Sequence, residues 1–257
     1  MHIAVLIKQV HALGITRTHS DEEDNPTDFR LNRLDEHALE EALRIKESCP
    51  GVTLTVLSVG PDRVTEALRR GLGMGADEAI HIKAELEPLS ATETAAALCP
   101  CLKELNPDFI LCGAMSEDLM QGMTGPALAA MLGIPFTTQA VKELGITPDA
   151  HTLDVTRDAG GGARQLLRIP MPCLITVQQG FNTPRYPTIS HMLKARGRLI
   201  ESRDAPPVSK TIATQITGTS PPTQRGRGTR IKGTPDEQAA QFVAYLRERQ
   251  VLPPAAR

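Results

Sequence analysis

The sequence has few aromatic residues and no long hydrophobic run. Only 3% of its 257 residues are aromatic and Trp is absent, so a core has to be built from aliphatic side chains. The N-terminal stretch MHIAVLIK is too short for a signal peptide, and no later segment is long enough to span a bilayer. We therefore expect a cytoplasmic protein without membrane insertion.

The sequence also lacks a strong charge of either sign and a paired cysteine motif. The net charge of −2 gives no support for nucleic acid as a partner. The five cysteines are scattered and include no Cys-x-x-Cys pair, so we expect reduced, mostly buried thiols. Cys99 and Cys101 lack a second pair that would complete a metal site.

Alternating apolar segments predict the fold of the first half of the chain. Strands are expected at residues 2–10, 52–59, 78–82 and 109–112, and helices at 32–47, 64–72 and 90–105. A loop at 11–30 contains an acidic run, 19–26, that we expect to be solvated. Strictly alternating strands and helices predict an α/β fold, a doubly wound parallel sheet of Rossmann type with helices on both faces.

The second half of the chain changes in character. Short strands are expected at 137–144, 152–157 and 164–169, with turns at 145–150 and 160–162, which together form a small antiparallel excursion over about 137–169. A buried strand at 173–177 then returns to the main sheet and ends the nucleotide-binding domain, 1–177.

Three further segments follow this domain. Residues 178–200 contain prolines and apolar side chains with no obvious core of their own, which favours an arm that docks on another chain. Residues 201–233 are typical of an extended linker. Residues 234–257 form a final amphipathic helix and tail with a capping box at Thr234 and Glu237; its apolar face packs on this chain or on a partner.

The most informative stretch runs from residue 109 to residue 132. It combines a buried strand, a loop rich in Gly and small polar residues, and an Ala/Leu/Met helix with Pro126 near its first position. In a parallel sheet, ligands bind beyond the carboxyl ends of the strands, and helix N-termini favour anions. This pattern predicts a nucleotide-phosphate loop, with an ordinary strand–turn–helix connection as the alternative.

No catalytic constellation accompanies this loop. The sequence places no Ser/His/Asp or Cys/His set on the expected loop ends, and no Walker lysine follows the glycines. Asn32 and Asp35 are explained equally well as caps of the first helix. The residues therefore favour a cofactor-binding subunit over a self-contained enzyme.

Five motifs in sequence resemble the beta subunit of electron transfer flavoproteins. They are KQV at 8–10, NRLDEHALEEA from Asn32, GAD at 75–77, the loop from Gly113 to Pro126, and PRYPTISHMLKA from Pro184. The similarity covers residues 1–200. It departs at Gly160, Arg164 and Met123, where the family has Asp, an acidic residue and Gln, and near Leu13, where some members have an aromatic residue against the flavin. These differences concern which nucleotide is bound and how the flavin is contacted.

The resemblance implies a heterodimer with an alpha subunit that carries FAD, with one wall of the FAD site supplied by this chain. It also implies AMP, or a second FAD in electron-bifurcating members, bound in this chain. The expected phosphate ligands are the N–H groups of 122–125 and the Thr124 hydroxyl. The implied cofactor contacts are Leu6, Asn32, Arg33, Leu34, Asp35, Val59, Gly113, Ala114, Met115, Ser116, Glu117, Asp118, Gly122, Met123, Thr124 and Gly125.

The resemblance further implies that the arm docks a partner dehydrogenase, such as an acyl-CoA dehydrogenase, with Ile189 as apolar anchor and Asp158 near the redox interface. The other implied partner contacts are Arg185, Tyr186, Met192 and Lys194. Two other classes share this sheet architecture. A universal-stress-type ATP- or AMP-binding regulator leaves the arm and tail unexplained, and an adenylating enzyme needs a pyrophosphate loop that residues 11–15 do not supply.

Overall fold

The computed structural model describes residues 1–11, 29–84, 90–142, 144–147, 151–207, 228 and 230–253. The chain divides into two compact units, Met1–Gln215 and Ile216–Arg257. The predicted acidic loop at 19–26, Leu13, the turn at 148–150 and most of the expected linker lie outside the described residues.

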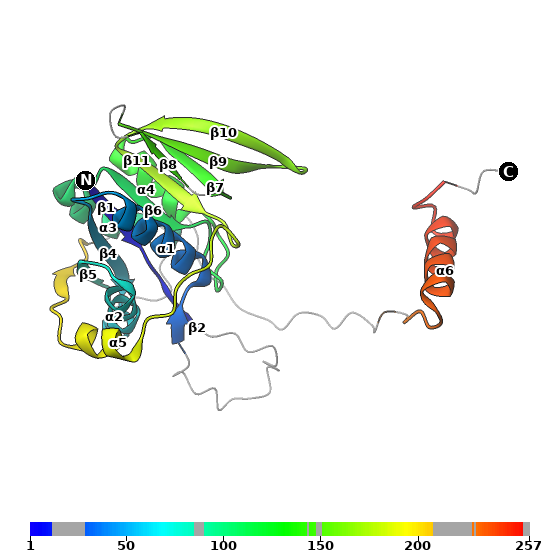
Figure 1. The fold of residues 1–257 in the computed structure, drawn as a ribbon, viewed down its shortest axis with the longest axis horizontal. Coiled ribbons are helices and arrows are strands. Elements are labelled where there is room, and N and C mark those ends of the chain that lie inside the picture. Colours follow the sequence, from blue (N-terminus) through cyan, green and yellow to red (C-terminus); the bar gives the residue numbers. More distant parts are fainter. Residues whose placement is uncertain are drawn as a thin grey trace. The chain divides into compact units, whose positions relative to one another are not determined.

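A large sheet forms the centre of the first unit (Figure 1). The strand order is β10-β9-β7-β11-β6-β1-β4-β5-β12, and β8 pairs with β9. The strands from β7 through β11, β6, β1, β4 and β5 to β12 are parallel, as predicted for a doubly wound fold. The bounds are β1 His2–Leu6, β4 Thr53–Gly60, β5 Glu78–Lys83, β6 Phe109–Gly113, β7 Phe136–Ala140, β8 Gly145–Thr147, β9 Thr152–Gly160, β10 Ala163–Pro170, β11 Cys173–Val177 and β12 Glu201–Asp204.

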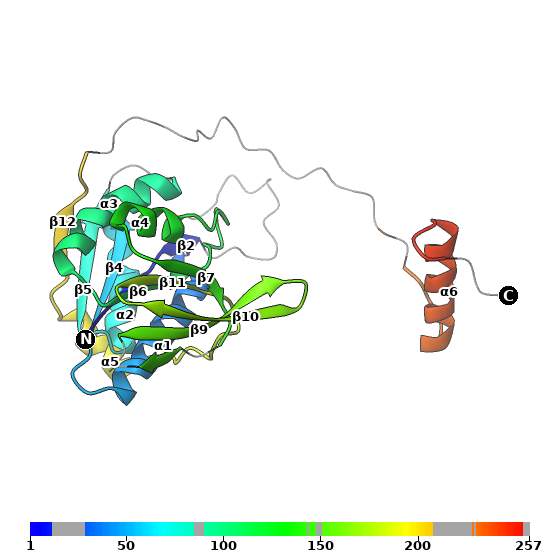
Figure 2. The same cartoon turned by 90° about the horizontal axis from the view of Figure 1, so that it is seen from above.

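Helices cover both faces of the sheet (Figure 2). One face carries α1 (Arg33–Ser48), α2 (Thr65–Met74) and α5 (Ile189–Arg196), and the other carries α3 (Ala91–Leu105) and α4 (Thr124–Leu132). A 3₁₀ turn, η1 (Asp62–Val64), directly precedes α2. Two buried clusters, one under each helical layer, form the core. They are almost entirely aliphatic, as the low aromatic content requires, and Phe109 is the aromatic among the largest fully buried side chains.

The expected first strand, 2–10, is interrupted after Leu6. The Lys8 N–H leaves the ladder and donates to the Asp35 carboxylate at 2.8 Å, while the Lys8 carbonyl accepts from the Asn32 N–H. Gln9–His11 then forms β2, which pairs antiparallel with β3 (Phe29–Leu31) outside the main sheet. The prediction of one continuous strand was therefore wrong, because the Asp35 carboxylate of α1 accepts the hydrogen bond that the Lys8 N–H would donate within the sheet.

Two other boundaries differ from the prediction. The expected strand at 137–144 ends at Ala140, and part of the expected turn at 145–150 is the strand β8. The first residues of the expected linker form β12, which extends the sheet beyond β5. The Arg203 guanidinium bridges Glu201 and Glu104 there, and this wholly polar edge strand carries no apolar pattern that sequence inspection detects.

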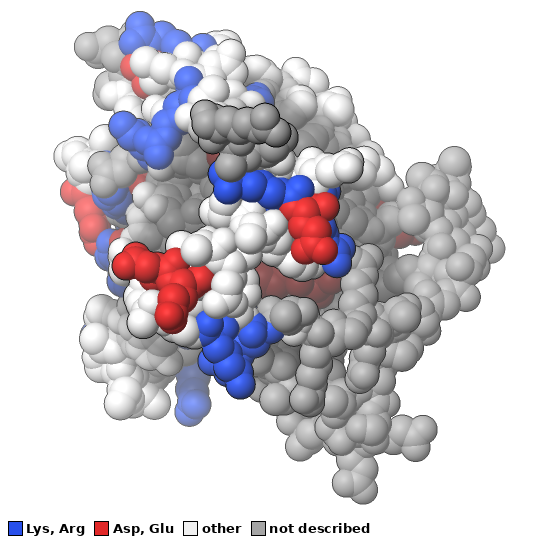
Figure 3. Space-filling model, turned by 90° about the vertical axis from the view of Figure 1, so that its right-hand side faces the viewer, with Lys and Arg blue, Asp and Glu red and all other residues white. Residues whose placement is uncertain are grey.

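The second unit contains the predicted final helix, α6 (Pro235–Glu248), and Thr234 and Glu237 form the expected capping box. None of its side chains is buried. Within the described part of the chain, no helix combines the length and apolar character needed to cross a membrane. Figure 3 shows Lys and Arg side chains and Asp and Glu side chains in small groups among uncharged residues.

Candidate functional site: a pocket at the carboxyl edge of the sheet

A pocket of about 390 Å³ opens where β1, β4 and β6 end. The chain leaves β1 towards β4 on one side and later places β6 on the other side, so this is the point where the strand order reverses. Ligands of doubly wound sheets bind at such a point. The walls come from the three strand ends, from α1 and α3, and from the loop between β6 and α4.

Asp35 joins two of these strand ends. One carboxylate oxygen accepts the Lys8 N–H after β1 and the other accepts the Gly113 N–H at the end of β6, both at 2.8 Å. Burial raises the pKa of Asp35 to about 7, although the bonds from Lys8 and Gly113 act in the opposite direction. Asp35 therefore braces the pocket wall, which explains its position inside α1 rather than at the cap.

Asn32 precedes α1 but its side chain makes no capping bond. Its amide instead donates to the Met115 carbonyl and accepts from the Glu117 N–H, each at 3.1 Å. The cap interpretation was wrong because this 1%-exposed side chain turns away from the helix to hold the loop after β6. Asn32 thus fixes the loop that forms one side of the pocket.

Ion pairs hold the same loop from outside. Lys8 pairs with Asp118 at 2.7 Å, and Arg30 and Arg33 approach Glu117 at 3.2 and 3.8 Å. All five side chains are at least 20% exposed, so each pair adds on the order of 1 kcal/mol or less. The carboxylates of Glu117 and Asp118 therefore have cationic partners within this chain.

The N-terminus of α4 points into the pocket. No described residue accepts a hydrogen bond from the backbone N–H groups of residues 122–125. Gly125 lets this helix end approach the sheet, because a Cβ there would lie 2.8 Å from Thr176 Cγ2 and 3.2 Å from Cys112 Sγ. Free N–H groups at a helix start form a ready site for an anion.

A group of stacked side chains beside the pocket, formed by β2, β3 and η1, was not predicted from the sequence. The Arg63 guanidinium lies 4.0 Å above the centre of the Phe29 ring and donates to Gln9 Oε1 at 2.8 Å, and the His11 ring lies 4.3 Å from Phe29. Gln9, His11 and Arg63 line the pocket. The short β2–β3 ribbon brings them together. The sequence did not predict this ribbon, because residues 2–10 were expected to form one continuous strand.

The structure brings most of the predicted cofactor residues together. Arg33, Leu34 and Glu117 do not line the pocket: Arg33 is exposed, Leu34 is buried against Gly113, and Glu117 braces the loop. The predicted residues that do line it are Leu6, Asn32, Asp35, Val59, Gly113, Ala114, Met115, Ser116, Asp118, Gly122, Met123, Thr124 and Gly125.

The predicted partner contacts lie in two separate places. Asp158 is near the end of β9, where its side chain accepts from the Gly160 N–H. In the arm, Tyr186 and Ile189 are more than 80% exposed and Lys194 is exposed. Arg185 is instead directed at α1, so its geometry does not favour direct contact with a partner.

The doubly wound sheet, with a pocket at its switch point, defines the Rossmann-like fold class. The electron transfer flavoprotein domain model matches residues 23–209. The beta subunit from Methylophilus methylotrophus is 32% identical over 96% of this chain and 98% of that protein. Those from Bradyrhizobium diazoefficiens and Homo sapiens are 34% and 30% identical, over 84% and 85% of this chain and 84% of each relative. The chain belongs to the electron transfer flavoprotein beta subunit family, which confirms the resemblance of its motifs.

Proposed function

We propose that this chain is the beta subunit of a heterodimeric electron transfer flavoprotein and holds an adenine nucleotide in the pocket at the carboxyl edge. The observation that carries the proposal is the free N-terminus of α4 inside a pocket of a chain from this family. FAD held mainly by the alpha subunit, with one wall from this chain, supplies the electron-carrying chemistry. The complex works in the cytoplasm, although one relative, from Arabidopsis thaliana, is named as mitochondrial.

The dimensions and polarity of the pocket support AMP. Its volume of about 390 Å³ is near the lower end for small-molecule sites, which favours a mononucleotide over a second FAD. The phosphate would accept the N–H groups of residues 122–125, together with the Thr124 hydroxyl. The adenosine would lie towards the ends of β1 and β4, against Leu6 and Val59.

The arm and the antiparallel strand pair β9–β10 support the proposed transfer of electrons. A dehydrogenase, such as an acyl-CoA dehydrogenase, docks on the exposed side chains of the arm, with Ile189 as apolar anchor beside Tyr186 and Lys194. Asp158 faces the redox interface. A universal-stress-type regulator would require none of these features.

The test is to express this chain with its alpha subunit, denature the purified complex and quantify the released nucleotides. We expect one FAD and one AMP per heterodimer. Two FAD and no AMP would replace the structural nucleotide with a second flavin. A colourless homodimer that releases ATP would overturn the proposal and favour the regulator.

Replacing Asn32 by Ala should weaken AMP binding about tenfold or more, because the loop loses two partly buried hydrogen bonds worth about 1 kcal/mol each. Calorimetric titration of AMP into the nucleotide-depleted complex measures this. A matched control is Ser48→Ala, which removes one side-chain bond at the other end of α1. Equal affinities in Asn32→Ala and wild type would contradict the role of the loop.

A further inference from the structure

The arm, residues 178–200, is fastened to its own chain along most of its length. The sequence predicted a segment with no core to serve, but Phe181 and Ala195 are 7% and 1% exposed. α5 packs against α2, where Met192 and Pro187 fill the space that a side chain at Gly73 would need. The arm is therefore an ordered part of this subunit, packed on α2 and on the core.

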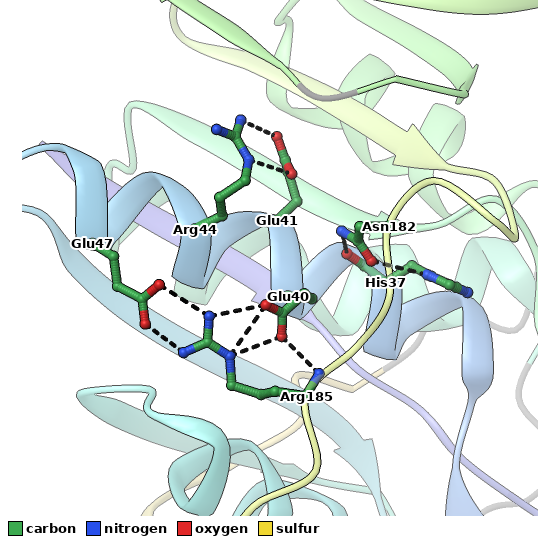
Figure 4. Close-up of polar contacts among 7 residues, drawn as sticks. All are labelled: His37, Glu40, Glu41, Arg44, Glu47, Asn182 and Arg185. Atoms are coloured by element: carbon green, nitrogen blue, oxygen red, sulfur yellow. Dashed lines mark hydrogen bonds and ion pairs between the residues drawn. The ribbon is translucent and has the colours of Figure 1, made fainter.

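The strongest fastening is at Arg185, and Figure 4 shows its geometry. Its guanidinium lies between Glu40 and Glu47 of α1, with Nε and Nη2 2.9 Å from Glu40 oxygens and Nη2 3.0 Å from Glu47 Oε2; Nη1 also donates to Glu47. The Arg185 backbone N–H donates to Glu40 at 2.9 Å. Each guanidinium nitrogen thus contacts a carboxylate of α1, and these carboxylates raise the pKa of Arg185 further above its ordinary value.

A pair of hydrogen bonds between His37 and Asn182 accompanies this ion pair one turn earlier on α1. His37 Nδ1 lies 3.0 Å from Asn182 Oδ1, and the Asn182 amide donates to the His37 carbonyl at 3.0 Å (Figure 4). Further along the arm, Arg69 of α2 donates to the carbonyls of Ala195 and Arg196. The contacts at Asn182 and Ala195 lie on either side of Arg185, which fixes the peptide that leads into α5.

The opposite side of the arm is apolar and exposed. Directly after Arg185, the Tyr186 side chain is 82% exposed and lies beside Arg70, with 5.1 Å from its guanidinium carbon to the ring centre. Ile189 and Leu193, one turn apart on α5, are 81% and 59% exposed. The inner side of the arm therefore binds α1 and α2, while its apolar outer side is free to contact a partner.

We infer that Arg185, held between Glu40 and Glu47, is a positioning residue that presents the outer face Tyr186, Ile189 and Leu193 to an electron-donating dehydrogenase. The inference rests on the proposed function, because it takes the arm as the docking surface. It differs from the direct partner contact expected for Arg185 from the sequence. Loss of the ion pairs between Arg185 and the two glutamates is expected to weaken docking without altering flavin binding or the transfer step.

The test uses the complex with the alpha subunit and three variants, Arg185→Gln, Arg185→Lys and Glu40→Gln. The matched control is Arg203→Gln, since Arg203 also bridges two glutamates but lies on the far edge strand β12. An acyl-CoA dehydrogenase that reduces the wild-type complex serves as electron donor. The readouts are KM and kcat for the complex, FAD content, and amide hydrogen exchange over residues 181–196.

For Arg185→Gln we expect KM to rise about tenfold, with kcat and FAD content unchanged and faster exchange in the arm. Arg185→Lys should restore part of the affinity, because an ammonium keeps the charge but not the planar fork. The Glu40 side chain is 13% exposed and that of Glu47 60%, so the pair with Glu40 is the stronger one and Glu40→Gln should also raise KM. Arg203→Gln should resemble wild type.

Three results would overturn the inference. Unchanged exchange in Arg185→Gln would mean that the ion pairs do not order the arm, and faster exchange with an unchanged KM would mean that its order does not matter for docking. A fall in kcat with unchanged KM would assign Arg185 to the transfer step instead. Failure of the proposed function is distinguishable, since the wild-type complex would then lack FAD or accept no electrons.

Discussion

Replacing Gly113 by Ala is expected to lower the free energy of unfolding by about 2 kcal/mol or more and to release the proposed nucleotide from the pocket. A Cβ at this position would lie 2.5 Å from Asp35 Oδ1, 2.6 Å from Leu34 Cβ and 2.9 Å from the Leu34 carbonyl carbon. A backbone atom cannot rotate aside, so the end of β6 must move away from α1. This displaces the Gly113 N–H from Asp35.

Thermal unfolding and nucleotide content of the complex measure this effect. The midpoint should fall by about 4–8 °C for a chain of this size. Gly197→Ala is the matched control, because its nearest atom, the Lys194 carbonyl oxygen, is 3.8 Å from the added Cβ and its φ is −85°. A Gly113→Ala complex that keeps both its midpoint and its AMP would contradict the close contact between β6 and α1.

Asp35→Asn tests the second large effect, which is a dependence of stability on pH. The folded pKa of Asp35 is about 7, above its ordinary value of 3.8, because burial disfavours the charged carboxylate; the folded state therefore holds the proton more tightly than the unfolded chain. The contribution of Asp35 to stability is therefore fully present below about pH 4 and is lost as the pH rises through about 7. Its total size is on the order of 4 kcal/mol.

We expect the wild-type midpoint to fall relative to the Asp35→Asn midpoint as the pH is raised from 4.5 to 8. The contributions of the other titrating groups to the pH dependence cancel in this comparison, because both proteins contain those groups. Parallel thermal unfolding of the two complexes across this range gives the difference directly. A difference that moves in favour of wild type with rising pH would mean that the two N–H bonds outweigh burial and hold the carboxylate ionised.

The position of the pocket was predictable because its elements are local in sequence. A buried strand, a glycine loop and a helix start follow one another over residues 109–132, and the strand–helix alternation places that loop at the carboxyl edge. The exact use of Asn32 and Asp35 was not predictable. Capping and bracing require the same residue types before a helix, and only the position of the loop after β6 decides between them.

The remaining differences arise from contacts between distant segments. β12 has no apolar pattern, since it lies at the edge of the sheet and pairs only through its backbone with β5. The apolar residues of the arm are divided between an inner side on α2 and an outer side in solvent, and their spacing alone does not reveal that division. Such features depend on tertiary neighbours rather than on local propensity.

The pairing of β12 with β5 has a consequence for how the subunit associates. The arm leaves the sheet at β11 and re-enters it at β12, so both of its ends are anchored in the same rigid layer. A tail with one free end loses conformational entropy when it binds, and that loss reduces affinity. In this subunit the arm loses its conformational entropy during folding, before any partner binds. A partner can therefore be recognised through a small contact area and released quickly, which suits the transient docking proposed for the arm.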